Sequence, residues 1–462
     1  MIFVKKIGLF VMLSIVLLIS ACSSNSGGNS TNGGNAIDSG QPKPNEGAAN
    51  GGTKTVVLSV MNKNRFLETA VREFENKHSN IHIEIKEFKV SEDAGGGGMN
   101  LQAISPADVE KYVQSVTTQV ISGKGPDLIL MSELPQDKFV AKKLLVDLND
   151  LLSKDSSIDP DALYTNILKA SQDGDGLYAM PLSFALSLFQ GDTELLKKAN
   201  ISVDPNESWD WNQFVEVAKK FKQNSESEKS INLAPISLLF DLIEDNYAEL
   251  VGQGQPNFDS DLFLNMIKDI KSMYDEGLLN EEMSFGAEAA FQMKDIYSPE
   301  QALTMPNSLA YYHKPSASGN KNGTTFKSMF SLGINSQSKV QQEAWTFIAY
   351  LLSDEMQELP DLFGVPINKA IADKKFNDIQ QKIENGTLET MMPKELLPDG
   401  ETVKKRIVEV EKLISAAKFR SSSDMKVLMI AMEEFNSFMS GQKSAEEVSK
   451  LIQNRVKTYL NE

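Results

Sequence analysis

Cysteine, histidine and tryptophan are scarce in this chain. Its 462 residues include one cysteine, three histidines and three tryptophans. A single cysteine excludes an intramolecular disulfide and any zinc or iron–sulfur site built from several thiolates. The histidines are His78, His82 and His313, and so small a set offers little material for metal sites or histidine acid–base catalysis. We therefore expect no metal site and no cofactor.

Positive charge is also in deficit, because 46 Lys and Arg residues stand against 63 Asp and Glu residues and the formal net charge is −17. Such a chain repels a phosphate backbone, so we expect no nucleic-acid partner. The sequence contains no GxxxxGK[ST], HExxH, CxxC or GxSxG motif, and thus no signature of an ATPase, a zinc protease or a serine hydrolase. Two acidic clusters, Glu281-Glu282 and Asp241/Glu244/Asp245, are interpreted as solvated helix faces.

A long apolar run stands near the N-terminus. Lys5 and Lys6 precede residues 7–20, which are almost wholly apolar, and this pattern indicates a secretory signal peptide over residues 1–21. The run ends in LISAC, which resembles the lipobox of bacterial lipoproteins. The resemblance implies cleavage before Cys22 and transfer of diacylglycerol to its sulfur, and two acyl chains suffice for stable membrane anchoring. The alternatives are a plain signal peptide or an uncleaved anchor with Cys22 incidental.

The segment that follows has low complexity. Residues 22–53 are rich in Gly, Asn and Ser and contain no aromatic residue. Such a composition buries too little apolar surface to offset its ordering entropy. We interpret it as a flexible tether behind the lipidated Cys22, of a kind that suits the outer face of a Gram-positive cell membrane.

The rest of the chain shows α/β patterning. Residues 55–61 form a β-branched apolar run, apolar residues then recur at helical spacing over 66–74, and alternation at 81–85 predicts a second strand. The sequence SPAD at 105–108 predicts a capped helix start, and 126–131 indicates a buried strand. This order of strand, helix, strand, helix and strand favours a largely parallel sheet with helices around it.

The second half repeats the theme with more helix. Strands are expected at 184–189 and 326–334, and helices at 209–221, 259–274 and 340–352. From residue 369 onward the pattern is almost entirely helical.

Several segments resemble, in order, the family-1 extracellular solute-binding proteins of ABC importers, the group that includes maltose-binding protein. They are VVLSVMNKNRFLETAVREFENKHSNIHIEI (56–85), YVQSVTTQVISGKGPDLILMSELPQDKFVAKKLLVDLNDLL (112–152), DGLYAMPLSFALSLFQGDTELLKKANI (175–201), SWDWNQFVEVAKKF (208–221), LGINSQSKVQQEAWTFIAYLLSDEMQ (332–357) and FGVPINK (363–369). The resemblance implies a two-lobed, periplasmic-binding-protein-like α/β fold, in which each lobe is a sheet flanked by helices and a hinge cleft lies between them. Lobe one is expected at 54–183 plus 306–354, and lobe two at 184–305 plus 355–462.

The resemblance further implies a monomeric binding protein and not an enzyme. It would capture a small polar solute, an oligosaccharide above all, and deliver it to ABC permease subunits in the membrane by closing its lobes. The alternatives are a surface glycoside hydrolase and a solute-sensing lipoprotein that feeds a sensor kinase.

Candidate ligand contacts follow from strand ends and from aromatic residues. In open α/β sheets, ligands bind beyond the carboxyl ends of strands, and sugars need polar groups together with aromatic faces. These criteria select Met61, Asn62, Asn64 and Arg65 after the first strand, Met131, Ser132 and Glu133 after the third, Phe184 at an expected lobe crossing, and Tyr297, Tyr311 and Tyr312.

The chain departs from the family at some of these positions. Many members of the family carry a tryptophan where this chain has Met61, and some carry an aromatic residue at Met131. We interpret the three tryptophans as core residues instead. The missing aromatic residue weakens the expectation of a sugar and leaves other polar solutes open.

Overall fold

The computed structural model describes residues 52–89, 105–205, 207–225, 230–280, 289–316, 323–390 and 392–461. The predicted signal peptide, Cys22, all but the last two residues of the tether, and the Glu281-Glu282 cluster lie outside these ranges. Within the described ranges, no helix has the length and apolar character needed to cross a membrane.

The strands of the described part form one hydrogen-bonded sheet in the order β2-β1-β3-β7-β4-β5. Strands β6 and β8 also pair with β4, and β9 pairs with β7. Their bounds are β1 Lys54–Val60, β2 Ile81–Glu87, β3 Leu128–Leu130, β4 Met180–Asp192, β5 Phe291–Ile296, β6 Leu309–Tyr312, β7 Thr324–Ile334, β8 Val365–Pro366 and β9 Ala417–Ser421. Pairing is parallel in β2-β1-β3, as the sequence predicts, and antiparallel between β4 and β7.

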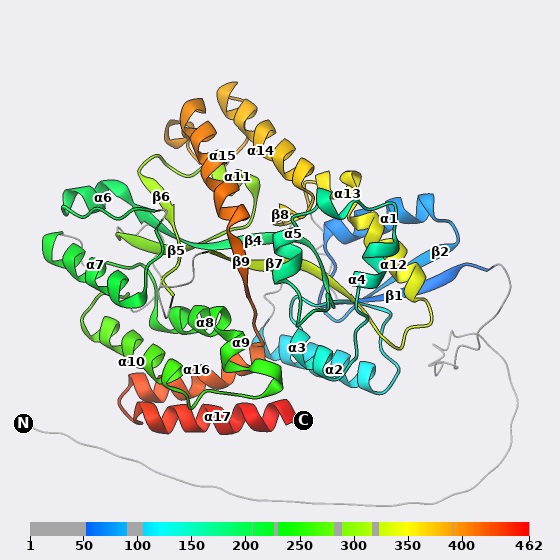
Figure 1. Ribbon diagram of the computed structural model, residues 1–462, viewed down its shortest axis with the longest axis horizontal. Coiled ribbons are helices and arrows are strands. Elements are labelled where there is room, and N and C mark those ends of the chain that lie inside the picture. Colours follow the sequence, from blue (N-terminus) through cyan, green and yellow to red (C-terminus); the bar gives the residue numbers. More distant parts are fainter. Residues whose placement is uncertain are drawn as a thin grey trace, which may run out of the picture. The chain divides into compact units, whose positions relative to one another are not determined.

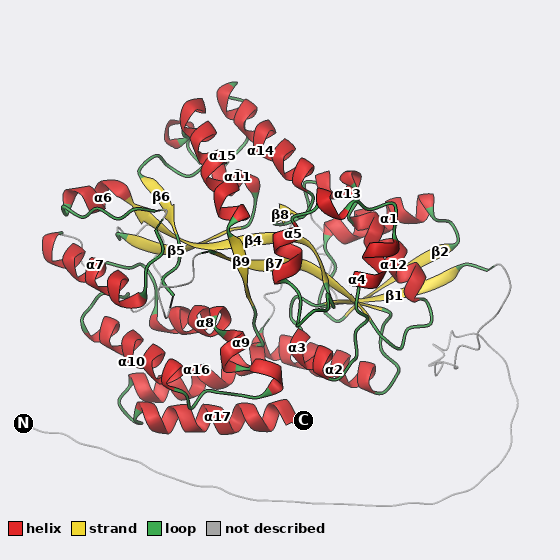
Figure 2. Ribbon diagram, in the orientation of Figure 1, coloured by secondary structure: helices red, strands yellow, loops and turns green. Residues whose placement is uncertain are grey.

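Helices cover this sheet (Figure 2), so the predicted class, an α/β fold with a helix-flanked sheet, is confirmed. The α-helices are α1 Arg65–Lys77, α2 Pro106–Ile121, α3 Gln136–Ala141, α4 Asn149–Lys154, α5 Thr165–Ala170, α6 Thr193–Lys198, α7 Trp211–Asn224, α8 Pro235–Asp245, α9 Tyr247–Leu250, α10 Asp261–Asp275, α11 Pro299–Leu303, α12 Gln341–Leu351, α13 Asp354–Glu358, α14 Lys369–Glu384, α15 Gly400–Ser415, α16 Met425–Met439 and α17 Ala445–Asn461. Short 3₁₀ turns occur at η1 Pro160–Ala162, η2 Gly252–Gly254 and η3 Lys394–Leu396.

Side-chain caps set several of these helix starts. Ser105 and Asp108 form the predicted capping box before α2, and Asp210 with Gln213 forms another at α7. In each box the side chains satisfy backbone N–H groups that the first turn leaves without a helical partner.

The apolar side chains gather in two large clusters. One surrounds β1, β2, β3 and most of β4, with α1, α12 and α14. The other surrounds α7, α8, α10, α16 and α17. Strand β4 contributes Leu188 to the first cluster and Phe189 to the second, so this single strand runs from one core into the other. The lobe boundaries predicted from the sequence remain a proposal.

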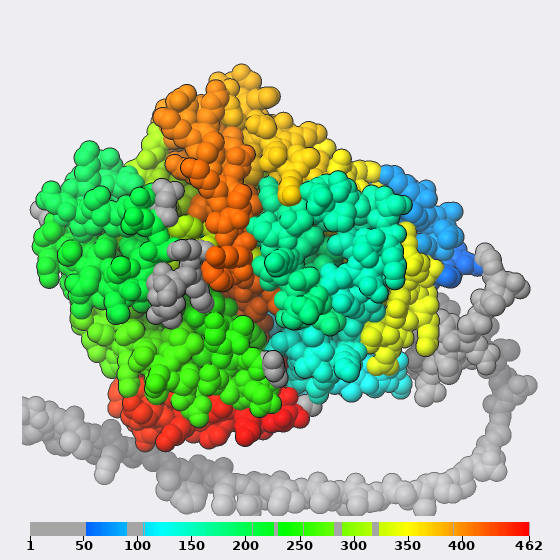
Figure 3. Space-filling view, viewed as in Figure 1, coloured from blue at the N-terminus to red at the C-terminus, as the bar shows by residue number. Residues whose placement is uncertain are grey.

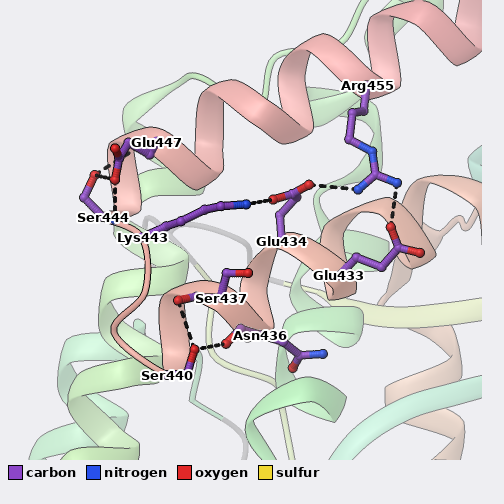
Figure 4. A network of polar contacts seen from close by, with 9 residues as sticks. All are labelled: Glu433, Glu434, Asn436, Ser437, Ser440, Lys443, Ser444, Glu447 and Arg455. Carbon is purple, nitrogen blue, oxygen red and sulfur yellow. Dashed lines mark hydrogen bonds and ion pairs between the residues drawn. The ribbon is translucent and has the colours of Figure 1, made fainter. Parts of the chain in front are cut away.

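The C-terminal helix pair illustrates how the second core is closed. Glu434 on α16 accepts hydrogen bonds from Lys443 Nζ at 2.7 Å and from Arg455 Nη1 at 2.9 Å, and Arg455 also reaches Glu433 (Figure 4). Ion pairs of this partly exposed kind contribute about 0–1 kcal/mol. The stronger attachment of α17 comes from Val448, Ile452 and Val456, which are fully buried.

Candidate functional site

The residues predicted after the first and third strands lie side by side at the carboxyl ends of β1 and β3, because these strands are parallel neighbours. Met61 and Met131 are nearly buried in a small apolar cluster under α2. Ser132 is exposed, and Glu133 is partly exposed. Burial raises the pKa of the Glu133 carboxyl, so this carboxyl keeps a proton more readily than a surface glutamate.

The other predicted residues after β1 differ in what their side chains do: one caps a helix, and two have accessible surface. Asn64 caps α1, because its Oδ1 accepts the Leu67 N–H at 2.8 Å. Arg65 is exposed and Asn62 is partly exposed. Asn62 and Arg65 therefore have accessible surface, whereas the Asn64 carbonyl oxygen is already engaged.

Three of the predicted aromatic residues are packed in the cores. Phe184 has no exposed surface and meets Tyr164 and Phe326 edge-on. Tyr311 is 6% exposed and Tyr312 is 3% exposed. In this arrangement these rings contact protein, and their role in solute contact stays a prediction.

Tyr297 differs, because it is partly exposed and lies against polar groups. Its hydroxyl donates to Asp295 Oδ2 at 2.6 Å. Its ring stacks on Phe363 with centroids 5.1 Å apart, and Phe363 is 47% exposed. This pair brings an accessible aromatic surface next to a carboxylate.

Asp295 belongs to a group of charged side chains that we name the charge cluster. It comprises Asp241, Glu244 and Asp245 of α8, Asp295 of β5, Lys327 of β7, and Lys314, which follows β6, with Ser187 of β4 among them. Residues at spacing i, i+3 and i+4 share one helix face, which explains why α8 presents its three acids together. Helix α8 lies against β9, beside β7 (Figure 1).

Lys314 occupies the deep part of the charge cluster. Its Nζ lies 2.6 Å from Asp241 Oδ1 and 2.7 Å from Asp245 Oδ2, and it donates to Ser187 Oγ at 3.2 Å. The side chains of Lys314 and Asp241 are 3% and 2% exposed. A buried lysine needs such partners, because an unpaired buried charge is costly.

Lys327 occupies the shallower part of the charge cluster. Its Nζ lies 3.2 Å from Glu244 Oε2 and 3.1 Å from Asp295 Oδ2, and the lysine side chain is 28% exposed. Ser187 faces Asp295 directly across the β4–β5 pair and donates to its Oδ1 at 2.7 Å. The cluster therefore reaches solvent at Lys327, while Lys314 is sealed.

The pKa values follow from burial and from these partners. Burial raises the pKa of Asp241 to about 7, against the opposing effect of Lys314. Burial also raises the pKa of Asp295, but Lys327, Tyr297 and Ser187 outweigh it, so the net shift is downward. Burial lowers the pKa of Lys314, but its two aspartate partners outweigh this and raise it overall. Glu244 and Asp295 likewise outweigh burial and raise the pKa of Lys327, so both lysines stay charged at neutral pH.

Acid exceeds base in the charge cluster, with four carboxyl groups against two ammonium groups. Two buried carboxylate oxygens, Asp241 Oδ2 and Asp245 Oδ1, have no hydrogen-bond partner. These two oxygens lie in the buried part of the cluster, so a ligand rich in hydroxyl groups can meet only the shallower part, where Lys327 donates and Glu244 and Asp295 accept. In the described ranges, no group of three or more His, Cys, Asp or Glu residues is placed to hold a metal ion.

Strand β7 connects the charge cluster with the predicted edge at β1 and β3. The Met131 N–H donates to the carbonyl of Ser331 on β7 at 2.8 Å. Lys327 precedes Ser331 by four residues on the same strand, which is about 13 Å at the usual rise of a strand. The predicted residues Met131 and Tyr297 therefore belong to regions joined by one strand.

Sequence patterns alone did not reveal most of this cluster. The interpretation of Asp241, Glu244 and Asp245 as a solvated helix face is wrong, because Asp241 is buried and paired. Lys314 and Lys327 were not among the predicted contacts. A usable signal existed at Lys327, since a lone charge in the apolar strand at 326–334 is expensive to bury without a partner.

Comparison with solved structures agrees with the fold. The sugar-binding protein MalE from Xanthomonas citri aligns with a TM-score of 0.58 at 14% identity, covering 88% of this chain and 98% of that one. A substrate-binding protein from Listeria monocytogenes in complex with cycloalternan aligns with a TM-score of 0.53 at 13% identity, covering 88% and 99%. Maltose-bound MalE3 from T. maritima gives 0.53 at 15% identity, covering 88% and 100%. At these identities the likeness concerns the fold.

The family itself follows from the sequence match. The family described as bacterial extracellular solute-binding protein matches residues 62–358, which is more than half of the chain. This range includes every charged residue of the charge cluster and all of the predicted contacts at the ends of β1 and β3 except Met61. The chain therefore belongs to the bacterial extracellular solute-binding protein family.

Proposed function

We propose that this protein is the lipid-anchored, substrate-binding component of an ABC importer and that it captures an oligosaccharide by closure of two lobes. The observation that carries this proposal is the charge cluster beside the Tyr297–Phe363 pair. Family membership supports a solute receptor outside the cytoplasm. Solved relatives bound to maltose and to cycloalternan support a saccharide.

The chemistry of the charge cluster suits a polyhydroxylated solute. Lys327 can donate hydrogen bonds to hydroxyl oxygens, and Glu244 and Asp295 can accept from hydroxyl groups. The exposed face of Phe363 can cover the apolar C–H face of a sugar ring. In this proposal Met131, Ser132, Glu133 and Lys327 meet the solute from lobe one, at 54–183 plus 306–354. The carboxylates of the charge cluster meet it from lobe two.

Anchoring would leave this receptor at the extracellular face of a Gram-positive membrane. Diacylglycerol on Cys22 and the tether over 22–53 would hold the folded part near the permease subunits that receive the solute. The LISAC sequence before Cys22 supports this part of the proposal.

A thermal-shift screen of the full chain against mono- and oligosaccharides tests the proposal. A ligand that binds only the folded state adds about 2.7 kcal/mol of stability at one hundred times its Kd. We expect one class of oligosaccharide to raise the melting temperature, and we expect no breakdown product when that glycan is recovered. The absence of a shift with every glycan would contradict the saccharide assignment, and recovery of cleaved glycan would favour the hydrolase alternative.

A further inference from the structure

A second group of acidic and phenolic side chains joins α3 to helices far away in the sequence. We name it the acidic contact and define it by Asp137 of α3, Asp424 before α16, Tyr459 of α17 and Tyr247 of α9. Helix α3 packs against η2, next to α9, and α2 packs against α16 (Figure 1). The contact therefore connects residues assigned to lobe one with residues assigned to lobe two.

Hydrogen bonds, a cation–π contact and an ion pair connect the residues in and around the acidic contact. The Tyr459 hydroxyl donates to Asp424 Oδ2 at 2.8 Å, and Asp424 Oδ1 accepts the Lys426 N–H at 2.8 Å. Lys138 Nζ lies 4.6 Å from the centre of the Tyr459 ring. Lys426 Nζ pairs with Glu110 Oε1 at 2.6 Å.

Two polar atoms of the acidic contact lack such bonds. The first is Asp137 Oδ2, which is buried without a hydrogen-bond partner. The Tyr247 hydroxyl is also buried without a partner, and Tyr247 is 5% exposed. A buried carboxylate oxygen that faces another carboxylate and lacks a donor is unfavourable when ionised. Protonation of Asp137 removes that charge and supplies a donor to the contact.

We propose that Asp137 binds a proton when the acidic contact forms, so that mild acid favours the arrangement in which α3 lies against α16 and α17. The proposal rests on the proposed function only in assigning these helices to two lobes that move apart. A receptor built this way would hold its solute longer in acid than at neutral pH.

The groups that face Asp137 set the direction of the effect. Asp424 at the start of α16, Asp173, Tyr247 of α9 and Tyr459 of α17 interact with it electrostatically. Lys138, its neighbour on α3, acts on Asp424, and Lys426 donates its backbone N–H to Asp424. Asp173 in turn accepts from Gln136 and pairs with Arg420 of β9. Burial, followed by the charge of Asp424, raises the pKa of Asp137 to about 6. An aspartate released into solvent titrates near its ordinary pKa of about 3.9.

The sign follows from proton linkage. The associated form binds the proton more tightly, so association gains stability as the pH falls through about 6 toward about 4 and loses it as the pH rises. The expected increase in the ratio of associated to separated molecules is about 25-fold between pH 7.5 and pH 4.5.

Distance measurements between two spin labels test this directly. The full chain carries Cys22→Ser, which removes its own thiol, together with Thr118→Cys on α2 and Lys457→Cys on α17, both at exposed positions. Without any solute, we expect the short-distance population to grow about 25-fold relative to the long one between pH 7.5 and pH 4.5. In the Asp137→Asn background, where the side chain is permanently neutral, we expect a large short-distance population at both pH values.

The matched control is Asp150→Asn, because the Asp150 side chain is 84% exposed and its removal should leave the pH response intact. A distance distribution that does not change with pH, or an Asp137→Asn variant that responds like the parent, overturns the proposal. Because no solute is present, either result leaves the binding screen unaffected. Conversely, a failed screen would count against the receptor function and leave this measurement unchanged.

Discussion

At pH 8 the Lys314→Met variant is expected to be about 3–5 kcal/mol less stable than the wild type, the usual cost of removing one partner from a buried ion pair. Lys314 is 3% exposed and is the cation nearest to Asp241 and Asp245. Methionine preserves most of the volume but leaves buried carboxylate charge without compensation. Urea denaturation followed by circular dichroism measures the loss.

The same variant should recover stability in acid. Burial raises the pKa of Asp241 to about 7 even with Lys314 present, and loss of the lysine raises it further. The folded state then binds a proton that the unfolded chain, with a pKa of about 3.9, releases, so stability rises as the pH falls from 8 toward 4. The deficit relative to wild type should therefore shrink at pH 5.

Two further variants make this prediction specific. Lys154→Met removes a lysine whose side chain is 75% exposed, and it should change stability by less than about 0.5 kcal/mol. Asp241→Asn added to Lys314→Met should restore part of the loss, since it removes one uncompensated charge. A Lys314→Met variant as stable as the wild type at pH 8 would refute the buried ion pair.

The Lys327→Met variant should bind the oligosaccharide selected by the screen about 10- to 100-fold more weakly, because a hydrogen bond to a charged group contributes about 1.5–3 kcal/mol. Lys327 is the more exposed of the two lysines in the charge cluster. Asp295 retains its bonds from Ser187 and Tyr297, so the loss of stability should be smaller than for Lys314→Met. Isothermal titration calorimetry gives the affinity.

Lys54→Met is the matched control for this binding experiment. Lys54 also pairs with a glutamate, Glu343, but it stands at the start of β1 with its side chain 57% exposed. Its replacement should leave the affinity unchanged. Equal binding by Lys327→Met and the wild type would remove Lys327 from the solute site.

Local sequence patterns predicted much of the fold. Periodicity placed the strands of β2-β1-β3, and SPAD at 105–108 marked the start of α2. The expected strand at 326–334 is β7, and the helix expected at 340–352 is α12. From residue 369 onward the chain is mostly helical as expected, but β9 interrupts it, since so short a strand depends on pairing with the distant β7.

The tryptophans show where burial could be predicted as well. Trp209 and Trp345, at 7% and 2% exposed, are core residues as predicted, whereas Trp211 is only partly buried against the second core. The indole N–H groups of Trp209 and Trp345 donate to the His313 carbonyl and to Asp155 Oδ2. The apolar face of α12 predicted the packing of Trp345, whereas Trp209 lies just before α7 begins. The polar partner of each indole depends on tertiary contacts.

The charge cluster could not be derived from local patterns for the same reason. Three acids on one face of α8 have the same local sequence whether they face water or a buried lysine. The decisive neighbour, Lys314, lies 73 residues from Asp241, and β-sheet pairing brings Ser187 and Asp295 together over 108 residues. Only the folded chain assembles these groups.

The central claim is that the charge cluster beside Tyr297 and Phe363 forms part of the solute site. A crystal structure of the full chain with the oligosaccharide selected by the screen tests it most directly. We expect sugar hydroxyls within hydrogen-bond distance of Lys327 Nζ and of a carboxylate of Glu244 or Asp295. A sugar bound elsewhere, with Lys327 still paired only to Glu244 and Asp295, would contradict the claim.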